Sequence, residues 1–192
     1  MWRINWNNRQ EISGQSYVCG FCGRYVGPSQ GYLGEVRDAP RNVQNANIYI
    51  CPNCQKPTFH HGEEQVPAPV YGNPVSGVPT EVSSLYDEAR RCMSVSAYTA
   101  AVLVCRKLLM HIAVQKGEKE GKSFIAYVEY LSDKGYVPPD GKGWVDHIRN
   151  RGNEANHEIA EITREHAEEL ITFSEMLLKF VFELPSRIPR KS

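Results

Sequence analysis

The chain has 192 residues, enough for one medium domain or for a small domain followed by a modest one. Hydrophobic residues make up 41% and charged residues 23%, as in soluble globular proteins, and no apolar run is long enough to cross a bilayer. Lys and Arg (22) balance Asp and Glu (22), which excludes a global basic field for non-specific nucleic-acid binding. The start, Met-Trp-Arg-Ile-Asn-Trp, lacks the features of a secretory signal. We therefore expect a cytoplasmic protein with no membrane segment.

Composition divides the chain into four stretches. Residues 1–61 are rich in Gly, Asn, aromatic residues and Cys, with short β-type runs. Residues 62–79 hold four prolines, which prevent a helix and disfavour a central strand, so we expect a semi-extended linker. Residues 80–185 have helical patterns, and residues 186–192 form a basic tail.

Two Cys-x-x-Cys pairs stand in the first stretch, Cys19-Gly-Phe-Cys22 and Cys51-Pro-Asn-Cys54. Two intervening residues let both thiolates of one tight turn face one ion, and two such turns complete the tetrahedron that zinc takes with four sulfurs. A β-prone run precedes each pair, as in the two hairpins of a zinc ribbon. We therefore predict one structural zinc per chain, since four thiolates leave no open position for catalysis.

Other interpretations of these residues compete with the zinc site. Two disulfides are the main alternative, although such closely spaced disulfides are usually redox-active rather than structural. His60 and His61 could compete as metal ligands. Cys92 and Cys105 fall on inward helical faces and are expected to be buried thiols.

The aromatic residues of the first stretch have two interpretations. Phe21, Tyr25, Tyr32 and Tyr49 could stack on nucleic-acid bases. A domain of this size also needs aromatic side chains to form a core, and this second interpretation is the favoured one.

Five helices are predicted in the third stretch, bounded by capping residues or by glycine and proline stops. They span about residues 80–93, 96–116, 123–135, 142–159 and 163–185. Thr80, Ser123 and Thr163 are the predicted N-caps, and Pro185 is the predicted final stop. The second helix is apolar on much of its circumference, so we expect it at the centre of the bundle. Short loops predict a mostly antiparallel bundle.

A polar stripe crosses the fourth predicted helix. It is formed by Asp146, Asn150, Asn153 and His157. A row of this kind is unusual for a solvated face, where Glu and Lys dominate. Asn153 precedes His157 by four residues and could fix the tautomer of its imidazole. Arg149 can reach the same region, and Arg151 lies farther around the helix.

The same segment carries a family resemblance. Ile148-Arg-Asn-Arg-Gly-Asn-Glu-Ala-Asn-His157, Tyr86-Asp-Glu-Ala-Arg-Arg-Cys92 and Ala97-Tyr-Thr-Ala-Ala101 are the motifs that carry it. They resemble the HEPN superfamily of α-helical bundles, and within it an uncharacterised bacterial branch, the domain of unknown function 4145. The resemblance covers about residues 79–185, and a zinc ribbon is a familiar N-terminal companion of this branch.

The resemblance implies an activity and a set of site residues. Catalytic HEPN proteins are metal-independent ribonucleases that act as dimers, with paired Arg–His motifs facing each other across the interface. Carried over, His157 is the acid–base group, Arg151 or else Arg149 holds the phosphate, and Asn153 supports the site. The position that aligns best with the catalytic arginine is Gly152, a departure that is typical of the branch.

The predicted fold class is α+β, with a small N-terminal β zinc ribbon followed by an all-α, HEPN-like bundle of about five helices. Two functions remain as hypotheses. The first is a homodimer that engages RNA or DNA, including as a ribonuclease, in a phage-defence, toxin or restriction context. The alternative is a non-catalytic ribbon-and-bundle module that binds nucleic acid or a protein partner of a defence or restriction system.

Overall fold

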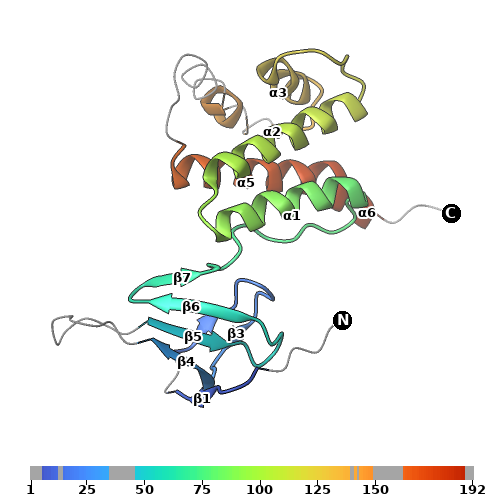
Figure 1. The fold of residues 1–192 in the computed structure, drawn as a ribbon. Coiled ribbons are helices and arrows are strands. Elements are labelled where there is room, and N and C mark those ends of the chain that lie inside the picture. The colour runs from blue at the N-terminus through green and yellow to red at the C-terminus, as the bar shows by residue number, and fades with distance from the viewer. Residues whose placement is uncertain are drawn as a thin grey trace. The chain divides into compact units, whose positions relative to one another are not determined.

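The computed structural model describes residues 6–12, 15–34, 46–138, 141, 143–148 and 162–188. The chain divides into two compact units, Met1–Val70 and Tyr71–Ser192 (Figure 1). The first unit is built from strands and the second from helices, which confirms the α+β class. Across the ranges given above, no helix combines the length and the apolar character needed to cross a membrane.

Seven short strands form the first unit. They are β1 (Gln10–Glu11), β2 (Tyr17–Val18), β3 (Tyr25–Val26), β4 (Gln30–Gly34), β5 (Ala46–Ile50), β6 (Pro57–His61) and β7 (Glu64–Val66). An antiparallel sheet has the order β1-β4-β5-β6-β7, and β2 and β3 form a separate hairpin. The two β-prone runs that precede the cysteine pairs are thus β2 and part of β5, as predicted.

The first unit has a small core. Ile12, Tyr17, Val26 and Tyr49 are buried together with two of the cysteines. His60 lies against the tyrosines, with its ring centroid 4.7 Å from that of Tyr17 and 5.1 Å from that of Tyr49. These few buried apolar side chains do not offset the conformational entropy that a unit of this length loses on folding. The first unit therefore needs a further constraint.

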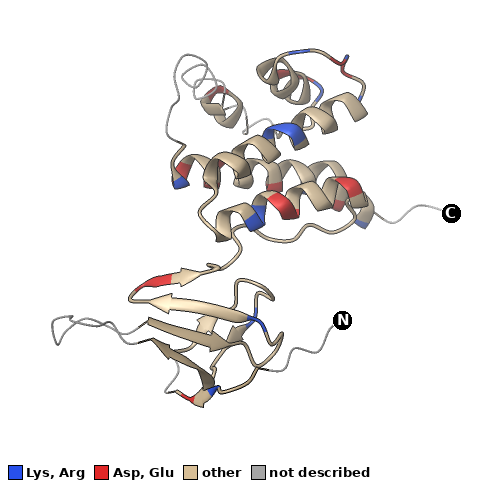
Figure 2. Ribbon diagram, viewed as in Figure 1, with Lys and Arg blue, Asp and Glu red and all other residues tan. Residues whose placement is uncertain are grey.

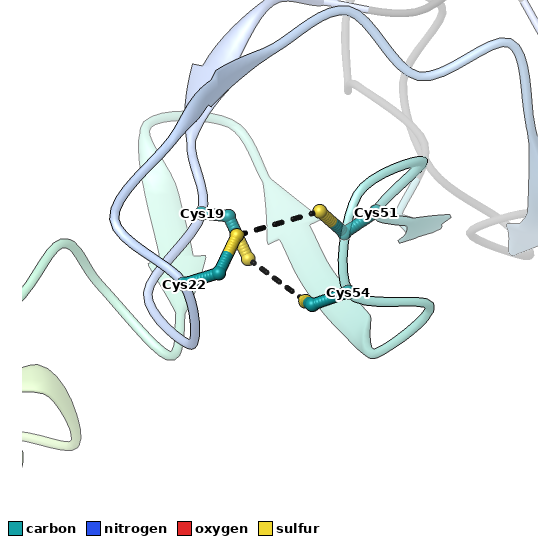
Figure 3. A group of neighbouring side chains, drawn as sticks. All are labelled: Cys19, Cys22, Cys51 and Cys54. Carbon is teal, nitrogen blue, oxygen red and sulfur yellow. Dashed lines mark hydrogen bonds between the residues drawn. The ribbon is translucent and has the colours of Figure 1, made fainter. Parts of the chain in front are cut away.

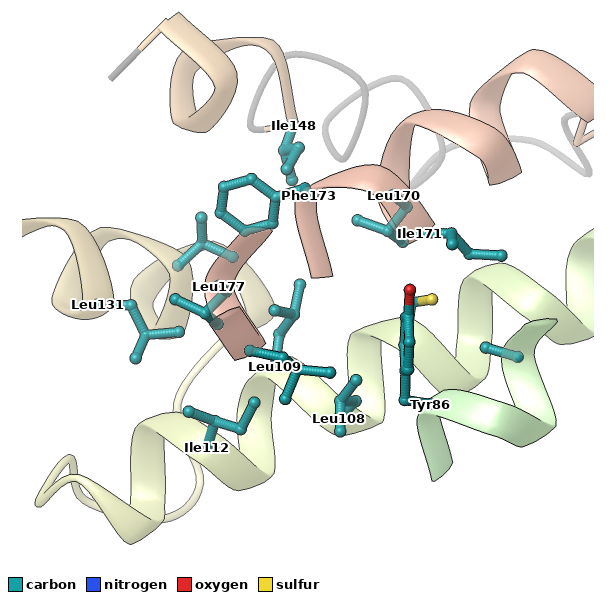
Figure 4. Close-up of a cluster of buried hydrophobic side chains, with 14 of the residues drawn as sticks. Tyr86, Leu108, Leu109, Ile112, Leu131, Ile148, Leu170, Ile171, Phe173 and Leu177 are labelled. Carbon is teal, nitrogen blue, oxygen red and sulfur yellow. The ribbon is translucent and has the colours of Figure 1, made fainter. Parts of the chain in front are cut away.

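The second unit is helical. It comprises α1 (Thr80–Ser94), α2 (Tyr98–Gln115), α3 (Phe124–Asp133), the helical residues 143–148, α5 (Arg164–Leu178), the π-helical segment η2 (Lys179–Glu183) and α6 (Leu184–Arg187). α2 contacts α1, α3 and α5, which confirms its predicted central place. Leu108, Leu109 and Ile112 of α2 are fully buried beside Phe173 and Leu177 of α5 (Figure 4).

The predicted N-caps are right for two helices and wrong for one. The Ser123 hydroxyl accepts a hydrogen bond from the Ala126 amide, and the Thr163 hydroxyl accepts one from the His166 amide, both at 3.3 Å. Thr80 is instead the first helical residue, and Pro79 occupies the cap position with an extended ψ of 145°. Because the proline ring fixes φ near the helical value, the helix begins directly after it.

The prediction that Pro185 ends the last helix is wrong. The helical path continues from α5 through η2 into α6, where Pro185 is in the first turn and its missing N–H is not needed. The π turn contains more residues than an α turn, so later residues leave the 3.6-residue phase of α5. As a result Glu183 is buried, while the apolar Leu184 is 46% exposed.

Residues 71–76, which we call the strap, lie along the helical unit and are held by side chains of α1, α5 and η2. Arg90 donates to the carbonyls of Tyr71 (3.1 Å) and Gly72 (2.8 Å). Glu175 accepts from the backbone N–H of Asn73 at 2.8 Å and from its side-chain amide at 3.1 Å. The Glu183 carboxylate accepts from the Ser76 amide at 3.1 Å. This second half of the predicted linker is therefore fixed to its own unit.

The Glu175 contact predicts a pH-dependent stability. Burial works to raise the pKa of Glu175, but hydrogen bonds from Lys179 and Asn73 outweigh it and hold that pKa below its usual range. A lowered folded-state pKa stabilises the fold above the unfolded value of about 4.3 and is lost as pH falls through the folded value. The wild type should therefore lose more of its urea midpoint than Glu175→Gln between pH 6 and pH 2.5. An equal loss in both proteins would contradict this role.

Candidate functional site

The four cysteines of the two Cys-x-x-Cys pairs come together in the first unit (Figure 3). Cys19 and Cys22 lie in the turn between β2 and β3, and Cys51 and Cys54 lie in the turn between β5 and β6. All four Sγ atoms lie within 4.8 Å of one another, with Cys19–Cys54 at 3.7 Å and Cys22–Cys51 at 3.8 Å. Zn–S bonds of about 2.3 Å in a tetrahedron place the sulfurs about 3.8 Å apart, so the cluster fits a metal of this size.

The two turns share one backbone pattern. In each, the amide of the first cysteine donates to the carbonyl five residues later, and its own carbonyl accepts from the amide four residues later. That fourth residue has a left-handed φ in both turns, +68° at Gly23 and +58° at Gln55. Glycine adopts this conformation freely, whereas Gln55 is an uncommon occupant whose side chain donates to the Pro52 carbonyl. Because the turns match, both aim their sulfurs at one centre.

A close backbone approach fixes the first turn. A Cβ atom on Gly20 would lie 2.5 Å from the Pro67 carbonyl oxygen and 2.4 Å from that of Ala68, which no ordinary contact permits. Gln65 also donates to the carbonyls of Val18 and Pro67, at 2.8 and 3.0 Å. The chain that follows β7 is thus packed on the turn that carries Cys19 and Cys22.

The structure decides two of the alternatives raised by the sequence. None of the six cysteines forms a disulfide, and the facing sulfurs of the cluster lie 3.7 and 3.8 Å apart, too far for an S–S bond, so the structure does not agree with the disulfide interpretation. Among the described residues, the metal-ligand group contains the four cysteines and neither His60 nor His61. His60 is a core side chain, and burial lowers its pKa. Cys105 is buried, as predicted, whereas Cys92 is only partly buried.

The thiols of the cluster differ in acidity when no cation is near. Burial raises the pKa of Cys19, and raises that of Cys54 to about 12. Burial also works to raise the pKa of Cys22, but hydrogen bonds from the Arg24 amide and the Asn53 side chain outweigh it and give a pKa of about 7. A bound divalent cation supplies the positive charge that buried, crowded thiolates require, and the protons are released as it binds.

Solvent exposure distinguishes the aromatic residues that could stack on bases from those that form the core. Tyr49 is buried, at 4% exposure, and the Tyr32 hydroxyl donates to the Asn7 carbonyl at 2.7 Å. Phe21 and Tyr25, in contrast, are 45% and 74% exposed next to the cysteine turn. Tyr49 therefore serves the core, while Phe21 and Tyr25 are accessible to a partner. The sequence signal for the exposure of Phe21 is its place between Cys19 and Cys22, inside the turn itself.

The predicted Arg–His site lies outside the described residues. Arg149, Arg151, Asn153 and His157 all fall in this part of the chain, so their roles stay predictions. The helix that leads into them is described, and there His147 Nε2 lies 2.8 Å from a Glu169 carboxylate oxygen. The pair borders a small hollow of about 240 Å³, also lined by Gly143 and Trp144. His147 and Glu169 are 22 residues apart in the sequence, and no motif marks them as a pair.

The helical unit has a larger groove, of about 640 Å³, along α5 and η2. Its lining is formed by Tyr71, Gly72, Asn73, Thr172, Glu175, Met176, Lys179, Phe180, Glu183 and Leu184. Its two carboxylates are already in use, because they hold the strap and accept from Lys179 and Arg187. The groove therefore offers an apolar surface rather than a charged site.

Comparisons with known proteins identify the family of the helical unit. No curated protein and no solved structure matches the chain significantly. The family model described as "Domain of unknown function (DUF4145)" matches residues 87–191, more than half of the chain. This range begins within α1 and includes every later helix described above. The chain therefore belongs to the DUF4145 family, with a four-cysteine β unit in front of the family domain.

Proposed function

We propose that this chain is a nucleic-acid-binding protein whose first unit is a zinc ribbon. The observation that carries the proposal is the cluster of four sulfurs, which two matched turns hold at tetrahedral distances. Four thiolates favour zinc or an iron site over harder cations, and zinc is the usual metal of two such turns on β-hairpins. The zinc is structural, because Cys19, Cys22, Cys51 and Cys54 complete its coordination.

The charge distribution of the first unit supports nucleic acid as the partner. The sequence has no Asp or Glu from residue 12 to residue 34 or from residue 39 to residue 62, the stretches that carry the cysteine turns. The described acidic residues of this unit, Glu11, Glu63 and Glu64, lie on β1 and at the entry to β7 (Figure 2). Phosphate groups therefore meet no carboxylate of the cysteine turns themselves.

Binding is tested with the full-length, metal-loaded protein and fluorescein-labelled oligonucleotides at low salt. We expect the anisotropy of a labelled single strand to rise with protein concentration and to fall when unlabelled strand is added. No change at any protein concentration up to about 100 µM, weaker than typical non-specific binding, would contradict the proposal.

Ribonuclease activity in a homodimer stays a prediction that rests on the resemblance to HEPN proteins. The expected result is cleavage of mixed RNA in EDTA, since the chemistry needs no metal, with loss of cleavage in His157→Ala. Zinc content is measured after the EDTA step, because the ribbon must stay intact. Retention of cleavage in His157→Ala would show that another residue or a contaminant is responsible. No cleavage by the wild type would favour the non-catalytic alternative.

A further inference from the structure

The turns that carry the cysteines present a small group of exposed side chains, Phe21, Arg24, Tyr25 and Lys56, which we call the knuckle surface. Tyr25 is 74% exposed and Phe21 is 45% exposed, although aromatic side chains usually avoid water. Arg24 and Lys56 are exposed as well. Two exposed aromatic rings and two exposed cations, with no carboxylate in either turn, are typical of a surface that binds a partner.

The knuckle surface is built across both turns. Lys56, which follows the second turn, lies with its Nζ 4.7 Å from the centroid of the Phe21 ring in the first. Arg24, which follows the first turn, donates to the Asn53 side chain of the second at 2.8 Å. These reciprocal contacts, together with the shared cluster of sulfurs, hold Phe21, Arg24 and Lys56 in one arrangement, and Tyr25 follows Arg24 as the first residue of β3. The surface therefore depends on the metal without taking part in its coordination.

We propose that the knuckle surface binds single-stranded nucleic acid, with bases stacked on Tyr25 and Phe21 and phosphates near Arg24 and Lys56. This inference rests on the proposed function and names its site and its ligand class. Exposed aromatic rings stack on any base, because every base has a π-face, and cations beside them follow the sugar–phosphate backbone. A duplex hides its base faces inside the helix, so a surface of this kind selects unpaired strands.

The number of phosphate contacts sets how strongly salt affects binding. Arg24 and Lys56 supply only two such contacts, so stacking on the aromatic rings supplies most of the affinity. Single strands show a slope of log K against log salt of about −0.7 per phosphate contact, so two contacts give about −1.4. A strongly basic nucleic-acid-binding protein would show a much steeper slope.

The test uses the full-length, zinc-loaded protein and four fluorescein-labelled probes: oligo(U), oligo(dT), a duplex of mixed sequence and an oligoglutamate peptide. We expect oligo(U) and oligo(dT) to bind and the duplex to bind more weakly. The ratio of the two single-strand affinities shows whether RNA or DNA is preferred. Tyr25→Ala is expected to weaken single-strand binding about 5- to 100-fold, and Phe21→Ala similarly. Lys56→Ala is expected to reduce the salt slope by about 0.7.

Two substitutions serve as matched controls. Phe180→Ala removes a half-exposed phenylalanine of the helical unit, and Arg9→Ala removes an exposed cation that precedes β1. Both should bind oligo(U) like the wild type, and every variant should keep the wild-type zinc content. A zinc-loaded Tyr25→Ala with full affinity would overturn the knuckle surface and leave the proposed function standing. Absence of wild-type binding to any oligonucleotide would overturn both, and a preference for the acidic peptide that Tyr25→Ala abolishes would assign the surface to a protein.

Discussion

Cys51→Ser is expected to release the metal and unfold the first unit while the helical unit keeps its signal. Cys51 is fully buried within the small core that it shares with Cys19, Tyr17 and Tyr49. Apparent binding energies of structural zinc reach about 10–16 kcal/mol, far more than a core of this size contributes. Loss of one thiolate should therefore remove most of the free energy that holds the β unit together.

The effect is measured by metal analysis and by two-dimensional NMR beside far-ultraviolet circular dichroism. Resonances of the β unit should collapse to unfolded positions, whereas the signal at 222 nm should change little. Cys92→Ser is the matched control, because Cys92 is a partly buried thiol of α1 outside the cluster. It should keep the metal and the β resonances. A Cys51→Ser protein with a folded β unit and no metal would show that the fold does not depend on the cluster.

Leu108→Ala is expected to cost the helical unit about 2–5 kcal/mol of unfolding free energy. Leu108 has no exposed surface and lies on the central helix α2, in the cluster that joins α1, α3 and α5 (Figure 4). Truncation there removes buried methyl groups and leaves a cavity that the packed neighbours only partly fill.

Leu103→Ala is an unusually close control for this substitution. It makes the same change on the same helix, so the change in helix propensity is the same, but Leu103 is 59% exposed. We expect its unfolding free energy to stay within about 0.5 kcal/mol of the wild type. Urea denaturation followed at 222 nm gives both values. Equal losses in the two variants would mean that α2 is not the centre of the core.

The features that the sequence predicted correctly are those set by local spacing. The helical pattern of residues 163–185 predicted the last long helix, and Ala167, Leu170, Ile171 and Leu177 of α5 are all buried. Two residues between paired cysteines were enough to predict the four-cysteine cluster, because the spacing defines the turn. The caps Ser123 and Thr163 follow equally local chemistry.

The features that the sequence did not predict arise from contacts between distant residues. The knuckle surface depends on Lys56 meeting Phe21 and Arg24 meeting Asn53, which only the pairing of two turns brings about. The burial of Glu183 depends on the π turn, since periodicity alone would have continued the apolar stripe. Leu103 belongs to the apolar circumference of α2, yet it is 59% exposed, so that circumference is not covered on every side.

The most direct test of the zinc ribbon is native mass spectrometry of the purified full-length protein, combined with elemental analysis. One zinc per chain is the predicted result, with all six cysteines reduced after the metal is removed under denaturing conditions. A protein that folds without metal, or one whose Cys19, Cys22, Cys51 and Cys54 are oxidised in pairs, would contradict it.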